Sequence, residues 1–155
     1  MEYFYFALGV IAVAVIIFVI INRHYHSKVA KIVQALEKLG DLKKADSSSY
    51  HYDLTIAETI YQIKIINTYS YQELSFNSNS HWQLKPSKKI KLISPGGFDK
   101  RLGVKIIIPL NTPAKIVKYL NENEIAFVEP LEKCFSYYLI TKENISFIKR
   151  IKKEA

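Results

Sequence analysis

Cysteine is nearly missing from this sequence of 155 residues, and the single Cys134 excludes an internal disulfide. That agrees with a reducing compartment and argues against the disulfide-rich secreted class. Glycine and proline number only five each, and neither an internal repeat nor a low-complexity tract is present. The length allows one domain with a real core beside an anchor, and excludes two such domains.

Charge is missing altogether from a run of 19 residues that begins at Tyr3 and ends at Ile21. As a helix this run spans roughly 28 Å, about the thickness of a hydrocarbon core. A buried core helix and a cleaved signal peptide are the alternatives. Such uniform apolarity is unusual for a core helix in a small domain, and neither a basic n-region nor a small-residue cleavage site is present. We therefore expect an uncleaved transmembrane helix.

Basic residues are missing before this run and frequent after it, where Arg23, Lys28 and Lys31 follow closely. Positive flanks stay in the cytosol, so we expect an N-terminus outside the cell membrane and a cytosolic C-terminal domain. The expected division is residues 1–26 as anchor and juxtamembrane segment, and residues 27–155 as the domain. The first partner that this predicts is the lipid bilayer.

Acidic residues are too few to balance the basic ones. After the apolar run, 22 Lys and Arg stand against 13 Asp and Glu, a formal charge of +9. Such an excess suits nucleic acid or anionic lipid headgroups. The alternative is a lysine-rich surface that keeps a tethered domain soluble. No feature indicates a particular protein partner.

The remaining pattern predicts an α+β domain. Apolar residues at three- and four-residue steps predict an amphipathic helix over residues 27–39, and residues 41–49 are polar enough for a loop. Segments rich in Tyr, Ile, Thr and Phe predict three strands in an antiparallel meander. These strands are expected at residues 50–57, 60–67 and 71–77.

The second half of the chain alternates between strands and helices. Residues 82–92 have a weaker pattern, and a Pro-Gly-Gly loop precedes a strand at 104–110. Thr112 and Pro113 are typical of a helix start, so a helix is expected to about residue 123. Short strands are expected at 125–128 and 137–140, and Thr141 begins a last helix to about residue 153.

The order of these elements and one short motif resemble the restriction-endonuclease-like fold. The segment from Asp53 to Lys64 reads DLTIAETIYQIK and resembles the PD-(D/E)xK nuclease signature, in which an Asp on one strand faces an acid-x-Lys on the next. The following Ile-Ile-Asn and Trp82 are similar to nuclease-related domains beside membrane anchors. The resemblance covers about residues 27–128. It implies an αβββαβ domain with a mixed sheet behind the transmembrane helix.

The resemblance also implies a catalytic site at Asp53, Gln62 and Lys64, with Mg²⁺ held at Asp53. In the family two acids bind the metal and the lysine steadies water or phosphate. A tight turn at Glu58 and Thr59 predicts that Asp53 faces Lys64, with all these side chains on one face. Gln62 stands where the second carboxylate belongs, and its neutral amide offers Mg²⁺ less. Glu37 or Glu58 would have to supply another acid. The alternative is an exposed Asp53–Lys64 ion pair.

A second candidate site is the loop of Gly96 and Gly97, followed by Lys100 and Arg101. Paired glycines allow consecutive backbone N–H groups to form a concavity that binds anions, and the nearby cations strengthen it. The alternative is an ordinary Pro-Gly turn that leads into a strand.

Two functions follow from the sequence. The first is a non-catalytic binding or scaffold module with a nuclease-like fold, held at the membrane surface. The second is a metal-dependent nuclease that acts on nucleic acid near the membrane. The missing carboxylate favours the first, and the sequence leaves open whether the protein is an enzyme.

Overall fold

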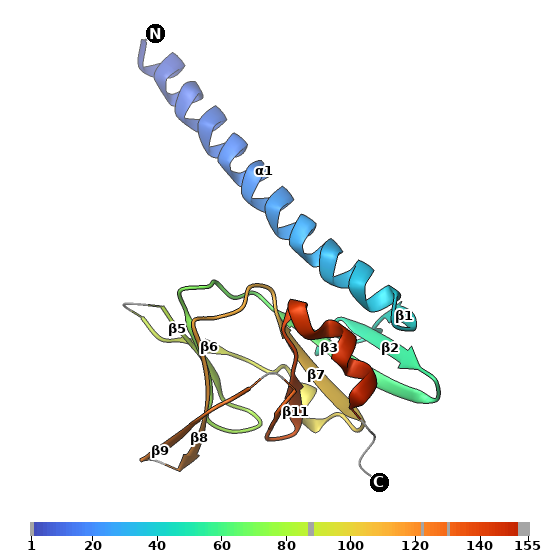
Figure 1. The fold of residues 1–155 in the computed structure, drawn as a ribbon. Helices are drawn as coiled ribbons and strands as arrows, with labels where there is room; N and C mark the ends of the chain where they lie inside the picture. The colour runs from blue at the N-terminus through green and yellow to red at the C-terminus, as the bar shows by residue number, and fades with distance from the viewer. Residues whose placement is uncertain (1, 87–88, 122, 130, 152–155) are drawn as a thin grey trace. The chain divides into compact units, whose positions relative to one another are not determined.

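The computed structural model describes residues 2–86, 89–121, 123–129 and 131–151, and their fold is α+β. One long helix precedes strands that form two mixed sheets, and two 3-10 segments complete the described part (Figure 1). The expected class, α+β with mixed sheets after an apolar N-terminal helix, is therefore confirmed.

The N-terminal helix α1 (Glu2–Glu37) contains both helices that the sequence predicts, without a break between them. It is long and apolar enough to cross a membrane, and none of its most apolar stretch is buried. The stretch is therefore not a core helix of the described chain. The chain forms two compact units with a boundary between Gln34 and Ala35, eight residues beyond the expected one, and each unit is described by itself.

Sheet A carries the first strands of the domain and is mixed. Its order is β1-β2-β3-β7-β11-β10, with antiparallel pairs except at β3–β7 and β7–β11, which are parallel. Its strands are β1 (Asp41–Lys44), β2 (Tyr52–Ile56), β3 (Thr59–Ile66), β7 (Val104–Pro109), β10 (Lys133–Cys134) and β11 (Tyr137–Leu139).

Sheet B is made from the segments that connect the parallel strands of sheet A. Its order is β6-β5-β4-β8-β9, and only β4–β8 is parallel. Its strands are β4 (Glu73–Phe76), β5 (Trp82–Lys85), β6 (Lys91–Ile93), β8 (Lys115–Asn121) and β9 (Glu124–Phe127). Because the chain passes repeatedly between the sheets, the two sheets belong to one folding unit.

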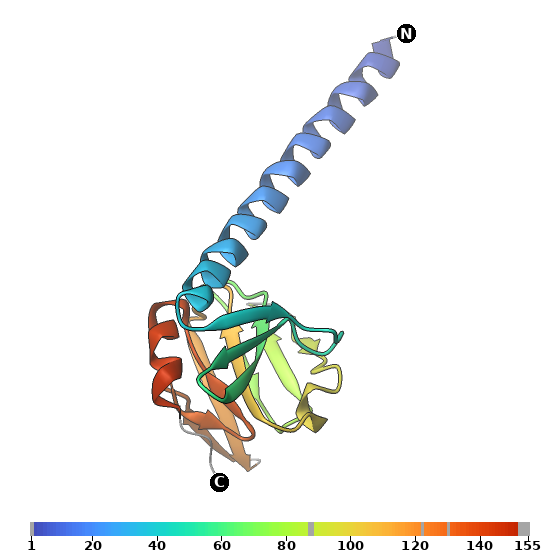
Figure 2. The same cartoon turned by 90° about the vertical axis from the view of Figure 1, so that its right-hand side faces the viewer.

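Successive side chains of a strand point to opposite faces of the sheet, and in sheet A both faces are covered by other parts of the domain. Apolar side chains are therefore buried on both faces. One face contributes Ile107, Tyr137 and Leu139 to a core that it shares with Phe76 and Trp82 of sheet B. The opposite face is covered by the 3-10 segment η2 (Lys142–Arg150), which lies outside the strands in Figure 2. Ile145 and Ile148 of η2 are buried, and the Tyr61 hydroxyl donates a hydrogen bond of 2.8 Å to the Ile151 carbonyl. The core therefore extends through both layers.

The predicted meander is wrong in its membership. β1, β2 and β3 form an antiparallel meander, but its first strand comes from residues 41–49, which were expected to be a loop. β4, the expected third strand, pairs with β5 and β8 in sheet B. β1 was missed because its sequence Asp-Leu-Lys-Lys is polar, as suits an edge strand.

The helix predicted for residues 112–123 is also wrong, because this segment forms strand β8. Ile116, Val117 and Tyr119 are β-branched or aromatic, and parallel pairing with β4 outweighs the weak helix-start signal of Thr112 and Pro113. The expected order of strands, helix and strand is therefore not that of the described chain.

The last helix is of the 3-10 type over Lys142–Arg150, not an α-helix to residue 153, and residues 152–153 lie outside the described part.

Candidate functional site

The β2–β3 hairpin brings Asp53 opposite Gln62, not opposite Lys64 as predicted. The turn is formed by Ala57 and Glu58, one residue earlier than expected, because Ala57 takes the left-handed conformation (φ 53°). The register therefore shifts by two residues. Asp53, Gln62 and Lys64 still share a face, because a shift of two preserves the alternation of side chains.

Lys64 is a structural cation in this arrangement. Its ammonium group donates hydrogen bonds to the carbonyls of Ser49 and Pro95, the latter at 3.0 Å, and lies 5.6 Å from the centre of the Phe98 ring. Burial lowers the pKa of Lys64 from its ordinary value. Lys64 forms no ion pair with Asp53 among the residues described, so the expected cross-strand pair is not formed.

Asp53 has a different partner, in the segment just before its strand. One carboxylate oxygen accepts a hydrogen bond of 3.2 Å from the Tyr50 hydroxyl, and this bond contributes to a raised pKa of Tyr50, after burial. No group of three or more His, Cys, Asp or Glu side chains that would hold a metal occurs among the described residues. Asp53 and the facing Gln62 thus offer one carboxylate and one amide.

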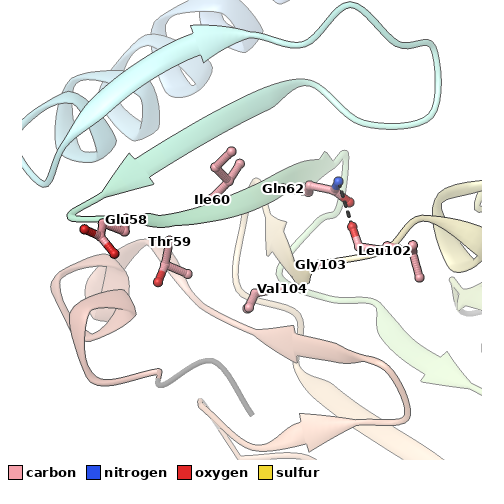
Figure 3. Close-up of a pocket in the computed structure, with 7 residues that line it drawn as sticks. All are labelled: Glu58, Thr59, Ile60, Gln62, Leu102, Gly103 and Val104. Carbon is pink, nitrogen blue, oxygen red and sulfur yellow. Dashed lines mark hydrogen bonds between the residues drawn. The ribbon is translucent and has the colours of Figure 1, made fainter. Parts of the chain in front are cut away.

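Gln62 has one satisfied amide group and one unsatisfied oxygen. Its Nε2 donates to the Leu102 carbonyl at 3.1 Å, while its buried Oε1 has no hydrogen-bond partner in the described chain. Gln62 lines a pocket of about 450 Å³ at the hairpin end of sheet A (Figure 3). The other lining residues are Glu58, Thr59, Ile60, Leu102, Gly103 and Val104. Glu58, one of the expected sources of a second acid, thus shares this pocket with Gln62, whereas Glu37 ends α1.

The glycine loop, residues 94–103, packs tightly onto the same face of sheet A. Gly96 and Gly97 both have positive φ, at 63° and 80°, which a glycine adopts without strain. The Gly96 N–H donates to the Ser94 hydroxyl, and the Phe98 N–H donates to the Pro95 carbonyl. Two of the three consecutive N–H groups in the expected anion site are therefore already used within the loop.

The two cations of this expected site are exposed. Arg101 donates a hydrogen bond of 3.1 Å to the Ser47 hydroxyl, which ties the glycine loop to the segment before β2. Lys100 ends the short 3-10 segment η1 (Phe98–Lys100). The structure thus brings Lys64 to the loop that contains Gly96 and Gly97, and joins the two expected sites into one packed region.

Lys105 has a structural role that the sequence did not predict. Only 6 % of it is exposed, yet its ammonium group donates to the carbonyls of Asp99, at 3.0 Å, and Arg101, at 2.9 Å. Burial lowers its pKa, and the charge of Asp99 partly opposes this shift. A lone lysine within the apolar strand Val-Lys-Ile-Ile-Ile was the available signal.

Phe98 completes the attachment of the glycine loop. It is fully buried and stacks on Tyr137, with ring centres 5.5 Å apart, and it lies 5.7 Å from the ring of Tyr50. Lys64, which is half-buried, and Lys105, which is buried, therefore bind four backbone carbonyls around the Phe98 ring. In this geometry both ammonium groups hold the glycine loop against sheet A.

Comparison with known proteins finds no matching family model, no significantly similar curated protein and no significantly similar solved structure.

Proposed function

We propose that this chain is a single-pass membrane protein whose cytosolic α+β domain is a non-catalytic binding module with a nuclease-like hairpin. The observation that carries this proposal is the use of Lys64, whose ammonium group is bound by the Ser49 and Pro95 carbonyls. Two of its three donors are thus used by the backbone, whereas a catalytic lysine directs its donors to water or phosphate. Gln62 also supports a role without a metal, because its neutral amide adds no negative charge beside the single carboxylate of Asp53.

The membrane part of the proposal rests on α1. Its apolar stretch is exposed along its whole length, and the basic residues Arg23, Lys28 and Lys31 all follow it in sequence. Positive residues beside a span stay in the cytosol, which gives the orientation proposed here.

Metal-dependent nuclease activity is the second candidate function, and one observation favours it. The register found for the hairpin sets Asp53 directly against Gln62 of the Gln-Ile-Lys triplet, which is closer to the facing pattern of the nuclease signature than the predicted register. In this alternative Mg²⁺ is the expected cofactor and nucleic acid the substrate.

A cleavage assay on the full chain in nanodiscs separates the two. The chain is mixed with fluorescent single- and double-stranded DNA and RNA in the presence of Mg²⁺ or Mn²⁺, beside Asp53→Asn and Gln62→Glu. We expect no cleavage by the wild type. Cleavage by the wild type that Asp53→Asn abolishes would establish the nuclease instead. Gln62→Glu restores the family's second acid and serves as the gain-of-function control.

Lys64→Ala is not a suitable discriminating variant. It removes the donor to two carbonyls, so it destabilises the domain whether or not Lys64 has a chemical role. Asp53→Asn keeps an oxygen that can accept the Tyr50 hydrogen bond, so its effect on activity can be read with little change in stability.

A further inference from the structure

The outer face of sheet B, which points away from the shared core, has an unusual composition. Strand register places one row of residues straight across all five strands on this face. The row is Leu92, Gln83, Ser75, Val117 and Phe127. The core-facing neighbours Leu74, Leu84 and Trp82 alternate with it, which fixes the direction of the row.

Two lysines lie over aromatic rings on this face. Lys85 lies 5.3 Å from the centre of the Tyr119 ring, donates a hydrogen bond of 2.9 Å to its hydroxyl and forms an ion pair of 3.2 Å with Glu73. Lys115 lies 5.6 Å from the centre of the Phe127 ring. Ser75 lies between these strands and is completely buried although it is on the outer face.

Large apolar side chains remain exposed at both edges of the face. Leu92 on β6 is 67 % exposed and Phe127 on β9 is 63 % exposed, and Ile125, on the same side of β9, is exposed as well. Ser75 and Val117 in the middle of the row are buried, so the exposed apolar groups form two strips at the edges of the face. Exposed apolar groups of this kind are typical of interaction surfaces. Lys89 and Ile90 are exposed just before β6, so this edge is both basic and apolar. Lys91 is exposed as well, but it pairs opposite Leu84 and therefore lies on the other face of β6 from Leu92.

This combination fits an anionic lipid surface. Aliphatic and aromatic groups enter the headgroup boundary, and lysines bind the lipid phosphates and carboxylates beside them. A second copy of the chain fits poorly, because a two-fold pairing of these faces would bring lysines against lysines.

The anchor brings the domain within reach of such a surface. The apolar run ends at Ile21 and the domain unit begins at Ala35, so the connecting helix is only about 20 Å long. A tethered face then meets lipid at a high effective concentration, and a weak individual affinity is sufficient.

We propose that the outer face of sheet B is a docking surface for anionic lipid headgroups, with Leu92 and Phe127 at the interface and Lys89 and Lys115 as the cations. This deepens the proposed function and rests on its membrane anchor. It assigns the binding activity to sheet B, and leaves the Asp53 hairpin and the glycine loop as parts of the scaffold.

The test uses an environment-sensitive fluorophore on single introduced cysteines in the full chain. Cys134 is buried, and burial raises the pKa of its thiol to about 12, so it does not compete for the label. Leu92→Cys and Phe127→Cys report on the proposed surface. Ile60→Cys, an exposed aliphatic position on sheet A, is the matched control.

In nanodiscs that contain phosphatidylglycerol, we expect a blue shift and stronger emission at positions 92 and 127, and no change at 60. Discs of phosphatidylcholine alone should give no shift at any position. Each lysine near an anionic surface strengthens binding about five-fold, so Lys89→Glu with Lys115→Glu should weaken docking at least about 25-fold. Lys43→Glu with Lys44→Glu, on β1 of sheet A, should not.

Equal emission at all three positions in anionic discs would overturn the proposal. A shift at 92 and 127 that follows protein density and not lipid charge would also overturn it, in favour of association between copies. Failure of the anchor is read separately, because an unanchored chain would not co-purify with the discs. The same labelled chains, mixed with preformed anionic vesicles, then still decide whether the face binds lipid.

Discussion

The lysines of sheet A and those of sheet B carry the same charge in opposite settings. Lys64 and Lys105 point into the packed region under the glycine loop, where their donors are taken up by four carbonyls. Lys85 and Lys115 lie over aromatic rings on an outer face. The difference teaches that net charge overstates what a domain offers to a polyanion. Part of the excess holds the fold together, and Lys115 on sheet B is among the exposed lysines that remain available for binding.

The sharpest test of this comparison is Lys105→Met, which keeps the apolar stem and removes the ammonium group. We expect a loss of about 2–4 kcal/mol in the free energy of unfolding, because the buried Lys105 loses two charge-assisted hydrogen bonds to partly buried carbonyls. Urea unfolding of the full chain in micelles, followed by the fluorescence of the single, buried Trp82, measures it. Lys100→Met, an exposed lysine of the same loop, is the control and should change little.

A smaller effect is expected from acid, through His51. Its Nδ1 accepts a hydrogen bond of 3.0 Å from the Ile65 N–H, and partial burial together with the nearby charge of Lys64 lowers its pKa below 6.5. Between that lowered value and 6.5 the unfolded chain binds more protons than the folded one. The stability linked to His51 is therefore full above pH 6.5 and is lost as the pH falls through the folded-state pKa.

Unfolding curves at a series of pH values from neutral to mildly acid check the His51 prediction. His51→Gln provides an amide oxygen for the Ile65 N–H but has no titration, so its stability should be flatter across this window. An identical acid dependence in both proteins would show that neither His51 nor its interaction with Lys64 causes the loss of stability in acid.

The smallest effect is expected from Lys115→Gln on the outer face. An exposed cation over an aromatic ring contributes about 0.5 kcal/mol, so the free energy of unfolding should fall by no more than roughly this amount. The same urea unfolding measures it beside Lys105→Met. If both variants lose equal stability, the distinction between lysines that stabilise the fold and exposed lysines on the outer face is wrong.

Local sequence patterns predicted where the strands lie better than they predicted which strands pair with one another. The strands β2, β3, β7 and β11 are each confirmed within two residues at either end, because β-branched and aromatic runs mark them. Sheet membership was not predictable in this way. Whether residues 73–76 pair with β3 or with β8 depends on contacts about 40 residues apart, and the same contacts turned an expected helix into β8.

The candidate site shows the same limit at the level of single residues. That Asp53, Gln62 and Lys64 share a face followed from alternation alone. Their register did not, because it depends on the left-handed Ala57, for which the sequence has no glycine or asparagine signal. The roles of Lys64 and Lys105 could not be predicted from the sequence. Both lysines bind backbone carbonyls, which every residue has, and the Pro95 carbonyl bound by Lys64 lies about 30 residues further along the chain.

The interleaving of the two sheets has a consequence for how the chain reaches its native state. The centre of sheet A forms only when β3 meets β7 and β7 meets β11, and the paired residues Tyr61 and Val104, or Lys105 and Tyr137, are far apart in sequence. Each pairing must close a long loop, at a cost in chain entropy, before any contact between the strands stabilises it. Folding should therefore be slow for a domain of this size. A nascent chain that ends before β11 has no complete core, and the domain matures only after nearly all of it has been synthesised.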